Sequence, residues 1–130
     1  MRLQIVTPDR AVLDCEVEEV YAPGTNGEFG ILPEHITFLS SLDVGALRYR
    51  IAGKDEFVAV SGGVTEVLDD SVTVLADTAE KSAAIDIERA KVAATAAEAA
   101  MEKHELGSIE YEEAAAALRR AQNRTAVAAL

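Results

Sequence analysis

The sequence has one cysteine, no tryptophan, three prolines and few basic residues, with 12 Lys and Arg against 23 Asp and Glu. The single cysteine, Cys15, excludes an internal disulfide, and its place in an alternating run predicts a small core or edge residue. The formal net charge of -11 repels phosphate backbones and anionic lipid surfaces. We therefore expect no nucleic acid partner and no direct binding to a lipid surface.

Signals for secretion and for membrane insertion are also missing. No window holds the roughly 18 apolar residues in a row that a membrane span requires. Residues 1–5 enter an alternating pattern at once, without the charged segment, apolar stretch and cleavage site of a signal peptide. These features predict a cytoplasmic protein that reaches a membrane only through a partner.

The residue types that are present divide the chain near residue 83. All three prolines and seven of the eight glycines come before that point, whereas 17 of the last 48 residues are alanine. The overall content of 49% hydrophobic and 27% charged residues is typical of a folded chain. The change in composition predicts one domain at residues 1–83 and a second at residues 84–130.

Short runs with period-two alternation and β-branched residues recur along the first domain, which is typical of a sandwich or barrel. The runs lie at 3–7, 15–21, 38–41, 46–51, 56–61, 64–68 and 71–75. Pro-Gly and Asn-Gly pairs indicate a loop at residues 23–27, and turn residues at 52–55 and 68–71 indicate two hairpins. We predict an antiparallel β-sandwich of seven to ten strands in two layers.

The second domain has a helical pattern, which makes the chain an α+β protein. Ala, Glu, Lys, Arg and Met fill nearly every position of 87–104, and Asp86 is placed to cap that helix. Gly107 can end the helix in a left-handed conformation, and Ser108 can cap a second helix over about 109–128. The sequence predicts a C-terminal antiparallel α-helical hairpin.

The predicted hairpin has few large apolar side chains, and its contact faces are otherwise alanine. Burial contributes about 0.8 kcal/mol per methylene, so an alanine contact stabilises far less than a leucine contact. We expect the hairpin to form readily but to dock weakly on the sandwich, so that one ligand could determine its position. The alternative is a plain alanine-rich packing hairpin.

A catalytic site is hard to assemble from this sequence. The glycines between residues 24 and 30 lack the Lys-Ser/Thr pair of a phosphate-binding loop, and Ser61 lacks the preceding glycine of a nucleophile elbow. His35 and His104 lie in different halves without further ligands nearby, which disfavours a metal site. We expect no catalytic residue and no metal. A small acidic hydrolase that uses Ser61 or paired carboxylates is the enzyme alternative.

One group of charged residues indicates a ligand. Asp86 lies at the start of the first predicted helix with Arg89 three residues later, and Arg120 and Arg124 form a basic stripe on the second helix. In an antiparallel hairpin the end of the second helix returns beside the start of the first. Three guanidiniums would then converge near a helix amino terminus, an arrangement that favours polyphosphate. The alternative is ion pairing within the helices, with acids such as Glu88.

Four stretches, taken in order, carry a resemblance to a known family. They lie at 24–35 (GTNGEFGILPEH), 57–67 (FVAVSGGVTEV), 72–79 (VTVLADTA) and 85–90, which holds an Ile-Asp-x-x-Arg-Ala motif. With the alanine-rich hairpin that follows, essentially the whole chain resembles the epsilon subunits of bacterial rotary ATP synthases.

The resemblance implies a non-catalytic rotor subunit of a proton-translocating F-type ATP synthase, peripheral at the cytoplasmic face of the bacterial plasma membrane. The sandwich would bind the gamma subunit and sit on the membrane-embedded c-ring. Glu28 and His35 match positions in the loop that faces the c-ring; their alternative role is turn structure and solvation. The hairpin would be a regulatory arm that lies against the sandwich or extends along gamma toward the catalytic alpha/beta head, where it blocks ATP hydrolysis.

The resemblance also implies a regulatory nucleotide site. Members similar to those of thermophilic bacilli bind one ATP in the compact state, as a clamp rather than a substrate, and no cofactor is required. The matching residues are Asp86, Arg89, Ala90, Arg120 and Arg124. Ala96 departs from the pattern, because it stands where such members have a further arginine. The alternative from another class is a free nucleotide sensor that binds ATP without forming a complex with gamma.

Overall fold

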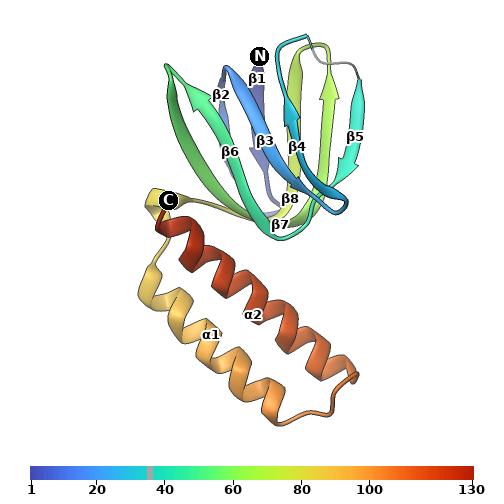
Figure 1. The fold of residues 1–130 in the computed structure, drawn as a ribbon, viewed down its shortest axis with the longest axis vertical. Coiled ribbons are helices and arrows are strands. Elements are labelled where there is room, and N and C mark those ends of the chain that lie inside the picture. The colour runs from blue at the N-terminus through green and yellow to red at the C-terminus, as the bar shows by residue number, and fades with distance from the viewer. Residues whose placement is uncertain (35–36) are drawn as a thin grey trace.

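Alternating apolar residues in the first 81 positions form β-strands that close over a shared core, and two helices follow (Figure 1). The computed structural model describes residues 1–34 and 37–130. The strands there are β1 (Arg2–Val6), β2 (Ala11–Glu16), β3 (Glu19–Gly24), β4 (Gly27–Ile31), β5 (Phe38–Ser41), β6 (Gly45–Ile51), β7 (Lys54–Leu68) and β8 (Ser71–Lys81). A short 3-10 helix, η1 (Ser82–Ala84), leads to α1 (Ile87–Glu102) and α2 (Ile109–Ala128). The predicted β-sandwich followed by an α-helical hairpin is confirmed.

Two long strands, β7 and β8, belong to both layers of the sandwich. They pair with each other along nearly their whole length, while the first part of β7 pairs with β6 and its last part with β5. The strand order β2-β1-β8-β7-β6-β3-β4 therefore folds over at these two strands. Figure 1 shows β7 sweeping from one side of the sandwich to the other past the end nearest the helices.

Glycine allows β7 to change direction in its middle. Gly63 has a φ of 114°, and a Cβ on it would lie 2.0 Å from the carbonyl oxygen of Leu75 in β8. Any side chain at this position would conflict with both the backbone conformation and the close approach of the neighbouring strand. The pair Gly62-Gly63 therefore marks where the chain passes from one layer to the other.

The core lies between the two layers and consists of aliphatic side chains at alternate strand positions, as the pleat of a strand requires. The fully buried Leu, Ile and Val side chains include Leu3, Ile5, Val20, Ile31, Leu47, Val58, Val60, Val67, Val72 and Val74. Cys15, on the edge strand β2, packs half-buried against this core, which confirms its predicted place. Burial raises the pKa of its thiol.

Two predicted sets of strand boundaries are wrong. The strand predicted at 15–21 is divided, since Cys15 pairs with β1 whereas Val20 pairs with β4 and β6. The alternation continues through this change of partner, so the sequence pattern does not mark it. The separate strands predicted at 56–61 and 64–68 are parts of β7, because Gly62 and Gly63 redirect the strand without ending it.

The loop predicted at residues 23–27 is shorter than expected, and the sheet is not wholly antiparallel. β3 ends at Gly24 and β4 begins at Gly27, so only residues 25–26 lie between the two strands. β1 pairs with β8 in parallel, which corrects the all-antiparallel prediction. A parallel pair joins strands that are distant in the sequence, and no local pattern indicates it.

Local signals set the helix ends. The Oδ1 atom of Asp86 accepts the backbone N–H three residues on, at 3.1 Å, and so caps α1 as predicted. The Oγ atom of Ser108 caps α2 in the same way, also at 3.1 Å. The second helix matches the predicted 109–128, whereas the first ends at Glu102, short of the predicted 104. Helix existence and capping follow from residues adjacent in the sequence.

The contact between the helices is made mainly by alanine, as the sequence predicts. The buried hairpin side chains in the described structure are Ala90, Ala97, Ala114, Ala121 and Val127. The helices lie antiparallel and side by side, and α2 makes the main contacts with the sandwich (Figure 1). Among the described residues, neither helix has the length and hydrophobicity needed to cross a membrane.

Candidate ligand pocket between the sandwich and the hairpin

Asn123 joins α2 to two strands of the sandwich. Its Nδ2 atom donates to the carbonyl oxygen of Gly45 in β6 at 2.9 Å and to that of Val60 in β7 at 3.5 Å. The contact is partly buried, so these groups are partly removed from water. Hydrogen bonds of this kind contribute about 1 kcal/mol each, which makes the attachment specific but small.

Arg119 makes a second attachment at the surface. Its Nη2 atom donates to Asp43 Oδ1 at 3.0 Å, and both side chains remain substantially exposed. The backbone N–H of Val44 and the Arg119 guanidinium hold the pKa of Asp43 below its ordinary value. Exposed ion pairs contribute only about 0.2–1 kcal/mol. This contact therefore orients the helix more than it stabilises the docked state.

A pocket of about 520 Å³ opens where the hairpin meets the sandwich. The sandwich residues that line it are Asp9, Arg10, Thr78 and Glu80. The residues from the helical part are Ala84, Asp86, Arg89, Ala90 and Arg124. Because both parts of the chain contribute walls, a pocket of this shape exists only while the hairpin is docked.

Four of the five residues predicted for a nucleotide site meet in this pocket. Asp86, Arg89 and Ala90 come from the start of α1. Arg124 comes from the last turns of α2, which the antiparallel hairpin returns to the same place. The structure thus brings two of the three predicted arginines together.

The third predicted arginine, Arg120, lies beside this pocket rather than in it. It lines a neighbouring pocket of about 450 Å³ between α2 and the sandwich. Thr78 lines both pockets, so the two adjoin at that residue. Ala96, the position that departs from the family pattern, is exposed on α1 and does not line the larger pocket.

Sequence reasoning missed the four sandwich residues of the pocket. Asp9 and Arg10 lie in the connection between β1 and β2, and Thr78 and Glu80 lie in the last part of β8. No spacing pattern links the β1–β2 connection to helices that begin far along the chain. Only the docking of the hairpin, which depends on tertiary contacts, brings these residues to one place.

The charges in the pocket are balanced, three arginines against three carboxylates. Arg124 Nε lies 3.9 Å from Glu80 Oε1, a long ion pair. Within residues 1–34 and 37–130, the guanidiniums of Arg10 and Arg89 have no ion pair. Guanidinium groups donate forked pairs of hydrogen bonds that match phosphate oxygens, so these two side chains are available to a phosphate-bearing ligand.

The residues predicted to contact a c-ring are described only in part. Glu28 is exposed in β4, next to the turn at residues 25–26, and is paired in register with Pro23. Its carboxylate has no ion pair in the described part of the chain. His35 lies outside the described residues. Glu28 is therefore accessible to a polar partner.

The serine and the acid pair that were considered for catalysis lie in a strand and in a turn of the sandwich. Ser61 is buried in β7, and its hydroxyl lies at hydrogen-bond distance, 2.5 Å, from that of Thr78. Asp69 and Asp70 form the turn between β7 and β8, with φ of 49° and 61°. Residues 1–34 and 37–130 hold no group of three or more side chains suited to a metal ion. Neither Ser61 nor the acid pair lies in an arrangement typical of a nucleophile or an acid–base pair.

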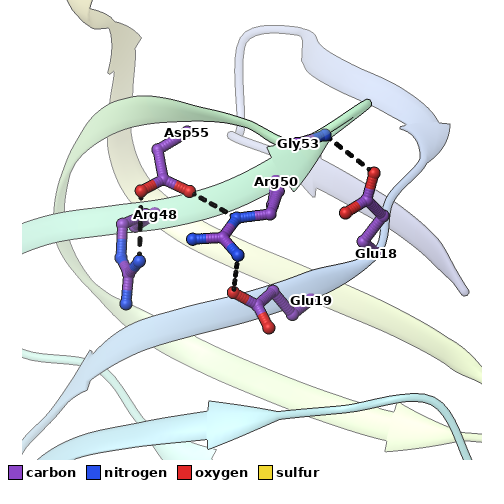
Figure 2. A network of polar contacts seen from close by, with 6 residues as sticks. All are labelled: Glu18, Glu19, Arg48, Arg50, Gly53 and Asp55. Atoms are coloured by element: carbon purple, nitrogen blue, oxygen red, sulfur yellow. Dashed lines mark hydrogen bonds and ion pairs between the residues drawn. The ribbon is translucent and has the colours of Figure 1, made fainter.

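A network of ion pairs joins β3, β6 and the start of β7 (Figure 2). Arg50 lies between Asp55, at 2.9 Å, and Glu19, at 3.5 Å, and Arg48 lies 3.2 Å from Asp55. The Arg48 guanidinium also lies 4.2 Å from the ring centroid of Tyr21. The Arg50 guanidinium holds the pKa of Asp55 below its ordinary value. The cations on this face are thus already paired with acids, unlike Arg10 and Arg89.

The outer face of the other layer carries exposed aliphatic side chains. Leu39, Val64, Leu68 and Leu75 are all exposed, and strand pairing puts them on one face. Val64 pairs directly with Leu75, and Leu39 pairs with Glu66, which lies between Val64 and Leu68 on β7. Clustered exposed aliphatic groups are typical of a surface that binds another protein.

Two family models match the chain, in the order of its two parts. The model described as ATP synthase, Delta/Epsilon chain, beta-sandwich domain, matches residues 1–82. The model described as ATP synthase, Delta/Epsilon chain, long alpha-helix domain, matches residues 84–129. The chain belongs to the family of ATP synthase delta/epsilon chains.

Individual relatives agree with this family over almost the whole chain. The ATP synthase epsilon chain of Syntrophobacter fumaroxidans is 49% identical over 128 residues, which are 98% of this chain and 95% of the relative. The ATP synthase epsilon chain of Nitratidesulfovibrio vulgaris (strain DP4) is 48% identical over 127 residues, 98% of this chain and 94% of the relative. The predicted resemblance is confirmed.

Solved structures share the fold at lower identity. A chain in the Euglena gracilis mitochondrial ATP synthase, described as OSCP/F1/c-ring, matches with a TM-score of 0.79 and 24% identity, over 95% of this chain and 78% of that one. A chain in the central stalk and c-ring of the Tetrahymena thermophila enzyme matches with a TM-score of 0.60 and 15% identity, over 95% of each chain. The sandwich followed by a helical hairpin is therefore the fold of these chains as well.

Proposed function

We propose that this epsilon subunit is a non-catalytic part of the central stalk of a proton-translocating F-type ATP synthase, coupling the gamma subunit to the c-ring. Membership of the epsilon family and the fold shared with chains of ATP synthase assemblies support this role. ATP synthesis would occur on other subunits. The chain would be peripheral at the cytoplasmic face of the bacterial plasma membrane, held there by its partners.

The sandwich would bind gamma through the exposed aliphatic face of Leu39, Val64, Leu68 and Leu75. Full burial of a large aliphatic side chain contributes about 1.5–3 kcal/mol, so four of them could anchor a lasting interface. Glu28, together with His35, would contact polar loops of the c-ring. The fully buried aliphatic core would let the sandwich transmit torque as one body.

The hairpin would be the regulatory arm. Its attachment to the sandwich depends on Asn123, on Arg119 and on the long Arg124–Glu80 ion pair. The helix pair itself is rich in alanine, so the hairpin could leave the sandwich while the aliphatic core stays intact. Extended along gamma toward the alpha/beta head, it would block ATP hydrolysis. Docked on the sandwich, it would permit hydrolysis.

ATP would hold the arm in the docked position as a clamp, without being consumed. The observation that carries this proposal is the pocket of about 520 Å³ with walls from both the sandwich and the hairpin. A ligand that binds only the docked form stabilises it by RT ln(1 + [L]/Kd), about 1.4 kcal/mol at ten times Kd. Arg89, Arg124, Asp86 and Ala90 line the site, and Arg120 would contact the ligand from the adjoining pocket.

Calorimetric titration of the full chain with ATP tests the nucleotide site. The wild type should bind with a Kd below about 1 mM, and Arg89→Ala should bind at least about tenfold more weakly, since a charged hydrogen bond is lost. Lys54→Ala removes a cation from the far end of the β6–β7 hairpin and should bind like the wild type. Equal binding by Arg89→Ala, or no binding by the wild type, would refute the site and leave the rotor role standing.

Co-purification from membranes tests the rotor role separately. A tagged full chain should retain gamma and c subunits, and Leu75→Asp should weaken the retention of gamma. Leu106→Asp, at an exposed position between the helices, is the control and should not weaken it. A chain that binds ATP but retains neither subunit would instead be a free nucleotide sensor, and ATP hydrolysis by the purified chain would favour an enzyme.

A further inference from the structure

We propose that Arg10 is the sandwich's contact to the phosphates of the bound nucleotide, and that this contact makes nucleotide binding depend on the docked hairpin. The inference rests on the proposed nucleotide site and adds to it a residue from outside the helical part. The contact between Arg10 and phosphate would link the ligand to the position of the arm.

The backbone fixes Arg10 at the edge of the pocket. The backbone N–H of Thr7 donates to the carbonyl oxygen of Arg10 at 2.9 Å, and the Thr7 hydroxyl donates to the same oxygen at 3.3 Å. These bonds close the short connection between β1 and β2, at the end of the sandwich nearer the helices (Figure 1). Arg10 thus lines the pocket from a defined turn rather than from a long loop.

No other role for the Arg10 side chain is apparent among the described residues. The residue is exposed, and its guanidinium makes no ion pair or hydrogen bond within residues 1–34 and 37–130. Its exposed position also means that it adds little to the core. A substitution that removes the guanidinium should therefore leave the fold unchanged, which makes the residue suitable for a test.

The charges of the pocket assign Arg10 to the phosphates. The other charged sandwich residues that line it, Asp9 and Glu80, are acids that repel phosphate, and Glu80 already faces Arg124 at 3.9 Å. Without Arg10 the pocket would hold two cations against three anions. Arg10 is therefore the sandwich group whose charge favours a polyphosphate over a neutral ligand.

This arrangement explains how binding could be linked to docking. Arg89 and Arg124 both belong to the hairpin, and they alone could bind phosphate whether or not the hairpin touches the sandwich. A phosphate held by Arg10 as well bridges the two parts of the chain. The ligand then binds the docked form more tightly than the undocked form, which is the condition for shifting the population.

The test compares the full chain with Arg10→Gln and Lys54→Gln, using ATP and AMP as ligands. Lys54→Gln removes the same charge from an exposed position of the sandwich and controls for net charge. We expect Arg10→Gln to weaken ATP binding about tenfold or more while changing AMP binding less, because AMP has a single phosphate. Hydrogen exchange with saturating ATP should show strong protection of hairpin amides in the wild type and less protection in Arg10→Gln.

The outcomes separate this inference from the proposed function. If the wild type binds ATP and Arg89→Ala does not, but Arg10→Gln behaves like Lys54→Gln, then Arg10 is not a phosphate contact and the nucleotide site itself stands. If Arg10→Gln loses affinity for ATP and AMP equally, Arg10 does not contact the β- and γ-phosphates, and its proposed role in favouring a polyphosphate is wrong. If the wild type does not bind ATP, the site and the role of Arg10 both fail.

Discussion

The sandwich and the hairpin of this epsilon subunit bury different kinds of side chain. The sandwich core is built from fully buried Leu, Ile and Val, whereas the hairpin residues buried in the described structure are four alanines and Val127. Both parts consist of regular elements, strands in the sandwich and helices in the hairpin. What differs is the apolar area that each removes from water when it packs.

Helix formation and the docking of the hairpin on the sandwich therefore have separate causes in this chain. Helix-forming residues and the caps at Asp86 and Ser108 specify the helices locally. Docking depends on Asn123, on Arg119 and on the long ion pair of Arg124 with Glu80, and these contacts are few and partly exposed. We expect the sandwich to behave as a cooperative unit and the hairpin to open from it at a lower free energy.

The largest expected loss of stability follows a substitution at Gly63, where β7 passes from one layer of the sandwich to the other. Gly63→Ala places a Cβ against the Leu75 carbonyl oxygen in a backbone conformation that disfavours alanine. Strain and overpacking together should lower the free energy of unfolding by about 4 kcal/mol or more, as measured by urea denaturation. The control is Gly53→Ala, which also has a positive φ but meets no atom within 4 Å. Comparable losses in the two variants would show that close packing at this point is unimportant.

A smaller loss of stability is expected when a side chain in the sandwich core is truncated. Leu47 is fully buried, so Leu47→Ala should lower the free energy of unfolding by about 3 kcal/mol through lost burial and a cavity. Leu75→Ala removes the same atoms from an exposed position of the isolated chain and should cost less than about 1 kcal/mol. Equilibrium denaturation of both variants measures the difference. A similar cost at the two positions would contradict the location of the core.

A still smaller effect, confined to the hairpin, is expected at Asn123. Asn123→Ala removes the donor to the Gly45 and Val60 carbonyl oxygens and should weaken docking by about 1–2 kcal/mol. Hydrogen exchange should quicken in α1 and α2 while the amides of β7 stay protected. Gln122→Ala, at the exposed neighbouring position, is the matched control. Loss of protection throughout the sandwich would mean that the two parts open together.

The smallest expected effect is a pH dependence of docking. The pKa of Asp43 is lowered from its ordinary 3.8 by the Val44 N–H and by Arg119, so this carboxylate stabilises the folded form fully above that value. Its contribution is lost as the pH falls through the lowered pKa. Backbone NMR shifts of α2 should report weaker docking as the pH falls below the ordinary value of 3.8, with a smaller change in Asp43→Asn. Identical titration curves for the wild type and Asp43→Asn would show that the contact between Asp43 and Arg119 does not contribute to docking.

The parts of the fold that the sequence predicts correctly are specified by neighbouring residues. Asp86, Gly107 and Ser108 act within a turn or two of the chain, and both helices lie close to where they are expected. The errors concern strand partners. The alternation through residues 15–21 continues although the chain changes layer, and the parallel pairing of β1 with β8 links distant segments.

The candidate site likewise contains residues whose meeting the sequence predicts and residues whose position depends on tertiary contacts. Asp86, Arg89 and Ala90 are close in the sequence, and an antiparallel hairpin returns Arg124 to them, so their meeting follows from the helical pattern. Arg10 comes from a turn whose position relative to the helices depends on docking alone. Arg120 is placed in the adjoining pocket, one helical turn from Arg124, because α2 turns that side toward β7 and β8.

Hydrogen exchange of the full chain, with and without saturating ATP, tests the separation of the two parts most directly. Without nucleotide, the hairpin amides should exchange through an opening of lower free energy than the one that exposes the amides of β7 and β8. ATP should raise the protection of the hairpin amides and leave that of the sandwich amides unchanged. Equal protection of both parts in both conditions would contradict a lightly docked arm.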